Sequence, residues 1–186
     1  MLRFKRGDQA AFEQLVRRNT HKVHALVYRF LGSGELADDL TQEVFLRVFR
    51  TAHRYEPAAK FSTWLYRIVA NLAFNVMRSR KRAHVYPMSA SGSDEEDGFE
   101  RNIPDERPER PGDALDQEEL RQDIAAAVAQ LPENQRVAVV LHQYEHKPYE
   151  DIAQVLDCTT MAVKSLLSRA RENLRRSLRR HLHDAS

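Results

Sequence analysis

Hydrophobic residues recur at spacings of three and four along most of this chain, which is the pattern of helices that bury one side. Gly7 and Asp8 supply a turn and an N-cap before the first helix, and Gly32 and Gly34 separate it from the second. The pattern predicts helices over 9–31, 35–50, 60–82, 113–131, 133–144 and 149–156, and a last helix from residue 160 onward. The expected fold class is therefore all-α.

Two stretches interrupt the helical pattern. Pro57 prevents a helix from continuing through Glu56, so a loop is expected at about 51–62. The stretch 87–112 is rich in charge and proline and has too few apolar residues to offset the entropy of ordering it. We therefore expect two helical domains, 1–86 and 113–186, joined by a flexible acidic linker over 87–112.

The predicted helix over 60–82 carries a group of side chains suited to nucleic acid. Trp64, Arg67 and Asn71 are spaced to lie on one side of it, and a basic cluster follows at 78–82. An indole, a guanidinium and an amide can stack on bases, contact base edges and hold phosphates. The same pattern also fits an ordinary amphipathic helix with its tryptophan in the core and its basic residues in water, and the helix alone does not decide between the two.

The formal net charge of +2 conceals a strong asymmetry along the chain. Residues 94–119 contain twelve acidic and three basic residues, a net charge of −9. Residues 160–183 contain seven Lys or Arg and the single acidic residue Glu172, a net charge of +6. A basic C-terminal element of this kind suggests a polyanionic partner.

Composition also excludes several classes of protein. Cys158 is the single cysteine, so neither an intrachain disulfide nor a thiolate metal cage is expected, and its neighbours indicate a small buried residue in a turn. The N-terminus has no apolar signal core, and no apolar run approaches the roughly 20 residues needed to span a bilayer. We expect no membrane insertion and a cytoplasmic location.

A metal or catalytic site has little support. His142 and His146 are four residues apart with Glu145 between them, which resembles part of a zinc-binding helix. The glutamate does not directly follow the first histidine, no third ligand is apparent, and Pro148 ends the helix. No glycine-rich phosphate loop or activated nucleophile accompanies them. We therefore expect no metal, no cofactor and no enzymatic activity.

The second half of the chain has the pattern of a helix-turn-helix. A short helix over 149–156 is followed by a turn at 157–160 and a longer basic helix, and the small Ala153 allows the two helices to cross closely. In such units the first residues of the second helix reach base edges in the major groove. Here those positions hold Thr160, Met161, Lys164, Ser165 and Ser168.

Several motifs in order resemble one known family. They are Gly7-Asp8-x-x-Ala11-Phe12, Asp38-Asp39-Leu40-Thr41-Gln42-Glu43-Val44-Phe45, Trp64-Leu65-x-Arg67-Ile68-x-x-Asn71, Leu131-Pro132-x-x-x-Arg136, Tyr149-Glu150-Asp151-Ile152-Ala153, and Val163-Lys164-Ser165 followed by Arg169-Ala170-Arg171. Together they resemble an extracytoplasmic-function (ECF) sigma factor, the minimal two-domain class of bacterial RNA polymerase initiation subunits. The match covers nearly the whole chain outside the linker.

The resemblance implies a role for each motif. Asp38, Asp39, Gln42 and Glu43 would bind RNA polymerase core. The loop and helix that follow would melt the −10 promoter element, in this chain with Tyr55, Lys60, Trp64, Arg67 and Asn71, while Arg78 and Lys81 would hold phosphates. The helix-turn-helix would bind the −35 element, with Arg169 and Arg171 added to the five residues above.

The resemblance also implies partners and a general role. They are polymerase core, promoter DNA and, because many members are held inactive by one, an anti-sigma factor. The regulon would be of the stress or envelope type. Two other classes stay open at this point, namely a helix-turn-helix regulator that binds duplex DNA without polymerase and a protein-binding helical adaptor.

Four positions depart from the family pattern. Leu166 stands where Arg is usual, and a leucine cannot contact phosphate or guanine as a guanidinium does. Met161 and His146 replace common glycines, and His53 is atypical in the melting loop. The base that this loop would capture is therefore not predicted.

Overall fold

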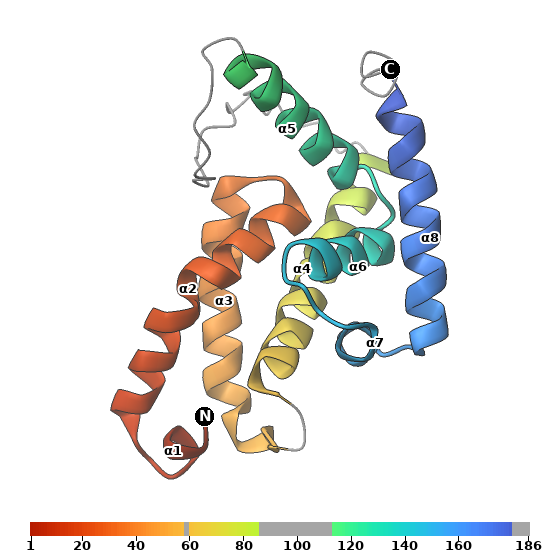
Figure 1. Ribbon diagram of the computed structural model, residues 1–186. Helices are drawn as coiled ribbons and strands as arrows, with labels where there is room; N and C mark the ends of the chain where they lie inside the picture. Colours follow the sequence, from red (N-terminus) through yellow and green to blue (C-terminus); the bar gives the residue numbers. More distant parts are fainter. Residues whose placement is uncertain (58–59, 86–112, 180–186) are drawn as a thin grey trace.

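The computed structural model describes residues 1–57, 60–85 and 113–179, which form helices and turns without a strand among them (Figure 1). The helices are α1 (Leu2–Lys5), α2 (Gln9–Leu31), α3 (Gly34–Thr51), the 3₁₀ helix η1 (Ala52–Arg54), α4 (Phe61–Val85), α5 (Asp113–Ala129), α6 (Glu133–Gln143), α7 (Tyr149–Leu156) and α8 (Thr160–Ser177). The predicted all-α fold is confirmed. The predicted linker over 87–112 lies outside the described residues.

The first two long helices form a hairpin whose ends follow the sequence signals. Asp8 caps α2, its Oδ1 accepting from the Ala11 N–H at 3.0 Å. Gly32 ends α2 in the left-handed conformation, with φ of 70°, which glycine adopts without steric cost. Ser33 then caps α3. Because only two residues separate the helices, α2 and α3 pack against each other.

The short helix α1 was not predicted, because four residues are too few for a periodic pattern. Phe4 is its buried residue, and its ring lies 4.7 Å from that of Phe12 and 5.3 Å from that of Phe49. Lys5 extends to the loop before α4, where its Nζ donates to the Tyr55 carbonyl at 2.7 Å. The N-terminal helix therefore supports both the α2–α3 hairpin and the loop before α4.

Helix α4 is buried on two sides, of which the sequence predicted one. The predicted side was Ile68, Leu72 and Val76 with Leu65, Val69 and Ala73 beside them; the last three are at most 1% exposed, whereas the first three are half-buried. Helix α4 packs with α2 and α3. The second buried side was missed and consists of Tyr66, Ala70, Phe74 and Met77. Its presence is explained by the C-terminal half, because α6 and α7 also pack against α4.

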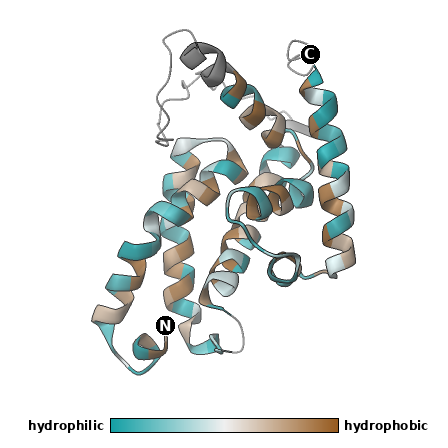
Figure 2. Ribbon diagram, in the orientation of Figure 1, coloured by the Kyte–Doolittle hydropathy of each residue, from teal (hydrophilic) through white to brown (hydrophobic). Residues whose placement is uncertain are grey.

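The C-terminal half is a bundle in which α6, α7 and α8 contact one another. Val163, Leu167 and Ala170 form the buried stripe of α8, as predicted. In Figure 2 the rest of that helix is mostly hydrophilic, which fits a helix that buries one narrow side. Thr159 caps α8, its Oγ1 accepting from the Ala162 N–H at 3.1 Å.

The two helical domains share one continuous core in this arrangement, which the sequence did not predict. Arg136 of α6 is the clearest polar link. Its guanidinium donates to the carbonyl of Phe30 at 2.7 Å, and also to those of Ala129 and Leu131. These hydrogen bonds satisfy backbone carbonyl groups at helix ends in both domains. Burial lowers the pKa of Arg136 from its ordinary value.

Candidate polymerase and nucleic-acid interfaces

The acidic residues of α3 lie on its solvent side. Ala37, Leu40 and Val44 turn inward, so Asp38, Asp39 and Gln42 are exposed and Glu43 is half-buried. Asp38 lies 3.1 Å from His24 Nε2, and Glu43 lies 3.7 Å from Arg47. Asp39 and Gln42 have no hydrogen-bond or ion-pair partner among the described residues, which leaves a carboxylate and an amide open to another protein.

Two exposed apolar side chains extend this acidic face, and the sequence analysis did not identify them. Leu46 is 50% exposed and follows Gln42 and Glu43 by one helical turn. Phe49 is 47% exposed at the edge of the aromatic cluster around Phe4. Exposed large apolar residues next to unpaired polar ones are typical of the centre of a protein-binding surface. Their exposure follows from helix phase, which the sequence pattern could have supplied.

The residues expected at the −10 element share one side of α4 and the turn before it. We call this the strand-opening face; it consists of Lys60, Trp64, Arg67, Asn71, Arg78 and Lys81. All of them are exposed except the half-buried Trp64. Their helical spacing therefore brings four basic groups, an amide and an indole onto a single strip.

Tyr55 does not lie on that strip. Its side chain is 6% exposed, and its ring packs edge-on against Trp64 at 5.3 Å and against Phe61 at 6.0 Å. The sequence suggested that Tyr55 would stack on a base, but its ring is already covered by these neighbours. The Tyr55 ring instead supports the Trp64 side chain by packing against it.

Three residues of the strand-opening face form ion pairs with the other domain. Lys60 Nζ lies 3.6 Å from Asp151 Oδ2, and Arg67 lies 3.4 Å from Asp157 Oδ1. Arg78 Nε lies 3.8 Å from Glu133 Oε2. The cations are half or more exposed, so each pair contributes little to stability.

A more buried polar cluster lies beside these pairs. The Tyr66 hydroxyl donates to Glu145 Oε2 at 2.5 Å, and Lys22 Nζ lies 3.2 Å from the same oxygen. The ammonium of Lys147 lies 5.1 Å from the centre of the Tyr66 ring. Burial and the hydrogen bond to Glu145 raise the pKa of Tyr66. None of these four residues was predicted to lie at a contact between the domains, and Glu145 was considered only beside His142 and His146.

The start of α8 presents the residues expected at the −35 element. Thr160, Met161, Lys164, Ser165, Ser168, Arg169 and Arg171 are all exposed. Met161 is 73% exposed, which is unusually open for a large apolar side chain. Because Val163, Leu167 and Ala170 hold the opposite side in the core, the exposed side is fixed in direction.

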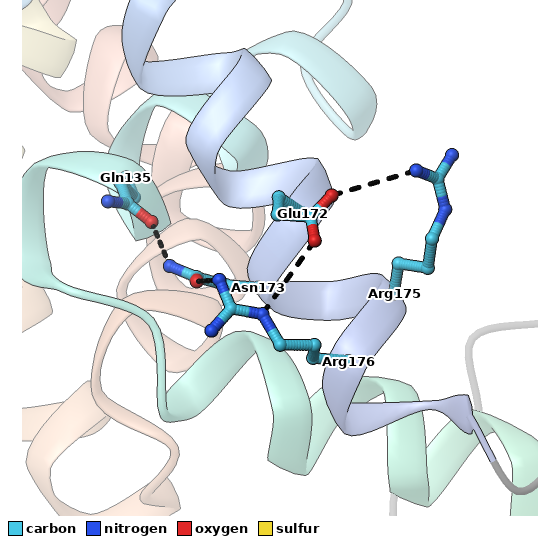
Figure 3. A network of polar contacts seen from close by, with 5 residues as sticks. All are labelled: Gln135, Glu172, Asn173, Arg175 and Arg176. Carbon is cyan, nitrogen blue, oxygen red and sulfur yellow. Dashed lines mark hydrogen bonds and ion pairs between the residues drawn. The ribbon is translucent and has the colours of Figure 1, made fainter.

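Further along α8 an acidic residue neutralises part of the positive charge. Glu172 lies 3.7 Å from Arg175 and 3.8 Å from Arg176, and Asn173 donates to Gln135 of α6 at 2.8 Å (Figure 3). Ser168, Arg169 and Arg171 line a shallow groove together with Glu172 and Arg175. Glu172 offsets one positive charge, so residues 160–168 carry a net charge of +1, from Lys164, and residues 169–177 a net charge of +3.

Two of the departures from the family pattern have a local structural setting. Leu166 is half-buried and packs against the core, so its side chain serves the domain's packing. His146 has φ of 48°, in the left-handed region that glycine occupies freely and histidine at a cost. This backbone conformation explains why glycine suits that position.

The described residues contain no group of three or more side chains arranged to hold a metal ion. His142 instead packs on the Tyr149 ring at 5.2 Å, and His146 lies in the turn after α6. Cys158 is partly buried, and burial together with Asp157 raises the pKa of its thiol. Among the helices of the described part of the chain, none is long and apolar enough to cross a bilayer.

Family models match both halves of the chain. Residues 15–83 match "Sigma-70 region 2", and residues 121–174 match "Sigma-70, region 4". The RNA polymerase sigma-H factor of Pseudomonas aeruginosa is 34% identical over 183 residues, covering 98% of this chain and 94% of its own. The ECF RNA polymerase sigma-E factor of Escherichia coli K12 is 36% identical over 170 residues, covering 91% and 87%.

Solved structures have the same fold. The sigma factor RpoE of Bartonella quintana, in complex with the anti-sigma factor NepR, has a TM-score of 0.65 at 23% identity and covers 91% of this chain and 97% of its own. CnrH, in complex with the cytosolic domain of CnrY, has a TM-score of 0.64 at 24% identity and covers 98% and 93%.

A region 2 helical module followed by a region 4 helix-turn-helix defines a sigma factor, and the chain belongs to the sigma-70 family. Sigma factors are non-catalytic initiation factors that bind RNA polymerase core and promoter DNA. Within the family, this chain is an ECF sigma factor. The alternative of a regulator that acts without polymerase is not supported.

Proposed function

We propose that the two domains divide the work of promoter opening as the family pattern suggests. Residues 1–86 would bind polymerase and melt the −10 element, 87–112 would connect the domains, and 113–186 would bind the −35 element. We also propose that the protein acts in the cytoplasm, because a polymerase subunit acts where the chromosome is.

The polymerase contact is assigned to the exposed side of α3. Asp39 and Gln42 support it because both lack partners among the described residues, so their polar groups need no internal bond broken before docking. Leu46 adds an apolar anchor one turn away. We assign Asp38 and Glu43 to the rim, because each already has a cationic neighbour.

Melting of the −10 element is assigned to the strand-opening face. A base leaving the duplex loses stacking worth a few kcal/mol, which contact with an aromatic face and with basic groups offsets. Trp64 is the half-buried aromatic residue of this face, and Lys60 and Arg67 flank it. Asn71 supplies an amide for a base edge, and Arg78 and Lys81 continue the positive strip toward the phosphates. Tyr55 is reassigned to supporting the Trp64 ring.

Contact with the −35 element is assigned to the first turns of α8. Lys164 and Ser165 lie beside Thr160 and Met161 on the open side of a capped helix, where side chains reach the floor of a major groove. Ser168, Arg169 and Arg171 follow at exposed positions, and the two arginines are suited to phosphates. Met161 offers an apolar contact, such as a thymine methyl group, where a glycine would offer none.

One observation carries the assignment above the others. One chain carries an acidic face on α3, a basic strip on α4 and exposed first turns of α8 that include Lys164. The side chains of these three surfaces face solvent or a polar interface. A protein that only bound duplex DNA would have no need of the acidic face on α3.

The polymerase assignment is tested with a charge reversal. We expect Asp39→Arg to weaken binding to core polymerase at least tenfold, because a cation would replace the unpaired carboxylate at the centre of the face. Binding is measured by fluorescence anisotropy, and initiation by sequencing transcripts made from fragmented genomic DNA with core polymerase. Glu13→Arg is the matched control, since Glu13 is exposed near the opposite end of the α2–α3 hairpin. Equal effects of both substitutions would contradict the assignment.

We also propose an anti-sigma factor as a partner of the free protein. Support comes from the relatives of known structure, of which RpoE is bound to the anti-sigma factor NepR. Affinity purification from cells, followed by displacement of the captured protein with core polymerase, tests this. A captured protein that does not compete with core polymerase would count against it.

A further inference from the structure

We propose that Met161 makes recognition of the −35 element depend on the methyl group of one pyrimidine. The factor then distinguishes thymine from unmethylated cytosine at that base pair and accepts a cytosine methylated at C5 in its place. This inference rests on the proposed contact between the first turns of α8 and the −35 element. It adds a chemical group on the DNA and a sensitivity to DNA methylation, neither of which that contact alone implies.

Met161 lies at the start of a stripe of exposed side chains along α8. Met161, Lys164, Ser165 and Ser168 follow one another at helical spacing, so they share one side of the helix, and all four are exposed. We call these four residues the reading stripe. Its other three side chains carry an ammonium or a hydroxyl group, so Met161 gives the stripe its apolar end.

The fold fixes the direction of the reading stripe. Val163 and Leu167 are at most 3% exposed and hold the opposite side of α8 in the core. The Thr159 hydroxyl oxygen accepts from the Ala162 N–H at 3.1 Å, which fixes the first turn of the helix. Met161 therefore has a defined backbone position, while its unbranched side chain stays flexible enough to follow the surface of a ligand.

Packing within the protein does not account for a methionine at this position. The side chain is 73% exposed, whereas the other open apolar residues Leu46 and Phe49 are 50% and 47% exposed. Burial of Met161 therefore adds little to the core, and alanine is a stronger helix former than methionine. What the methionine adds is apolar surface at the end of the reading stripe.

The major groove offers one kind of apolar group to such a side chain. Every base pair presents hydrogen-bond donors and acceptors there, and thymine adds a methyl group at C5. The Met161 side chain has no donor and only a weak acceptor, so it discriminates base pairs by contact with that methyl group. A cytosine methylated at C5 carries the same group at the same ring position, and we therefore expect the same contact.

The first experiment removes the methyl group alone. Promoters found by sequencing transcripts made with core polymerase supply the −35 element. Each thymine of the element, on either strand, is replaced in turn by deoxyuridine, which pairs with adenine in the same way but lacks the C5 methyl group. Run-off transcription is measured at subsaturating holoenzyme, and deoxyuridine placed outside both promoter elements is the control template.

The protein variants separate contact through Met161 from other effects. Met161→Ala shortens the apolar side chain, and Met161→Leu keeps it. We expect the wild type to lose about threefold or more of its transcription at one deoxyuridine position, as burial of one methyl group implies. Met161→Leu should show the same loss, and Met161→Ala should transcribe the thymine and deoxyuridine templates equally. A wild type without any methyl-dependent position, or the same dependence in Met161→Ala, would overturn the proposal.

The second experiment adds the methyl group to cytosine. At the position found above, the thymine–adenine pair is replaced by a cytosine–guanine pair, with and without a methyl group at C5 of the cytosine. We expect methylation to raise transcription by the wild type about twofold or more and to make no difference to Met161→Ala. Equal transcription of the two templates by the wild type would overturn the sensitivity to methylation.

Failure of this inference and failure of the proposed function give different results. If α8 does not contact the −35 element, replacing the whole element by an unrelated sequence leaves transcription by every variant unchanged. If α8 contacts the element without a methyl contact through Met161, that replacement lowers transcription while the deoxyuridine substitutions have no effect.

Discussion

Arg136 is a charged residue placed where helices from both domains end. Its guanidinium donates to the carbonyls of Phe30, Ala129 and Leu131, and its Nη1 lies 3.6 Å from the Met77 sulfur. A planar fork with five donors can reach several carbonyls at once, whereas an ammonium is a single point of charge. Arg136 belongs to the Leu131-Pro132 motif, so the structure gives that motif a structural role rather than a contact with DNA.

We expect Arg136→Lys to lower the free energy of unfolding by about 2 kcal/mol or more, because helix-end carbonyls would lose their donors while a charge stays buried. Urea unfolding followed by circular dichroism measures this. Arg50→Lys, on the exposed end of α3, is the control and should change stability by less than about 0.5 kcal/mol. A similar small change in both variants would contradict the role assigned to Arg136.

Tyr66 makes the contact between the domains sensitive to alkaline pH. Its ordinary pKa is 10.0, and burial with the hydrogen bond to Glu145 raises the pKa in the folded protein. The folded state therefore keeps a proton that the unfolded state loses. The stability that Tyr66 contributes is complete below about pH 10 and is lost as the pH rises above it.

The slope of this loss is at most about 1.4 kcal/mol per pH unit for one group. We expect unfolding measured between pH 9 and pH 11, approximate limits set by the tyrosine pKa, to show a steeper loss in the wild type than in Tyr66→Phe. The pKa of Tyr28 is also raised by burial, but this contribution is common to both proteins and cancels in the comparison. Parallel curves would mean that Tyr66 titrates as in the unfolded chain.

At the scale of secondary structure, the exposed faces of α3 and α8 depend on where each helix begins and on which side it buries. Thr159 and Ser33 fix the starts of α8 and α3 by accepting from backbone N–H groups. Burial of Val163 and Leu167 then sets which side of α8 is open, and Ala37 and Leu40 do the same for α3. The chemistry of both faces therefore follows from capping and helix phase.

We expect Thr159→Ala to destabilise the protein by about 1 kcal/mol, because the Ala162 N–H would lose its acceptor at the start of α8. Hydrogen exchange should show faster exchange confined to the first turn of α8, and thermal unfolding reports the loss of stability. Thr51→Ala is the control, since its hydroxyl donates to the Arg47 carbonyl at the end of α3 and caps no helix start. Unchanged exchange at Ala162 in the Thr159 variant would contradict the capping role.

At the scale of the molecule, the two domains are held together by an interface that mixes apolar and polar contacts. Met77 of α4 is buried with its sulfur 3.6 Å from the Arg136 guanidinium, and Tyr66 with Lys22 meets Glu145. The four cross-domain ion pairs of Lys22, Lys60, Arg67 and Arg78 all place the cation on the N-terminal domain and the carboxylate on the C-terminal one. Such one-sided charge makes the two surfaces complementary.

We expect fragments 1–86 and 113–186, produced separately, to associate in solution, with an affinity that falls as salt is raised. Isothermal titration calorimetry measures this. Glu145→Arg in the C-terminal fragment should weaken association at least tenfold, because it would bury a cation between Lys22 and Tyr66. Glu150→Arg, on an exposed position of α7, should weaken it much less. Absence of association by the unsubstituted fragments would contradict the interface.

The local sequence determined the helices, most of their ends and the exposed faces. Hydrophobic spacing fixed which side of α2, α3 and α8 is buried, and Asp8, Gly32 and Thr159 act where their backbone preferences place them. The motifs identified the family, and helix phase alone put Asp39 and Lys164 in solvent. These features depend on residues a few positions apart, so the sequence alone contains them.

The tertiary structure decided what lies between the domains. Nothing near Tyr66 in the chain predicts its contact with Glu145, because the two are 79 residues apart. The second buried side of α4 was missed for the same reason, since a helix covered on two sides by distant segments loses the simple pattern of one apolar face. Tyr55 was expected to be open to DNA, but it is covered by Trp64 and Phe61. Long-range packing therefore selects which of the residues suited to DNA are free to bind it.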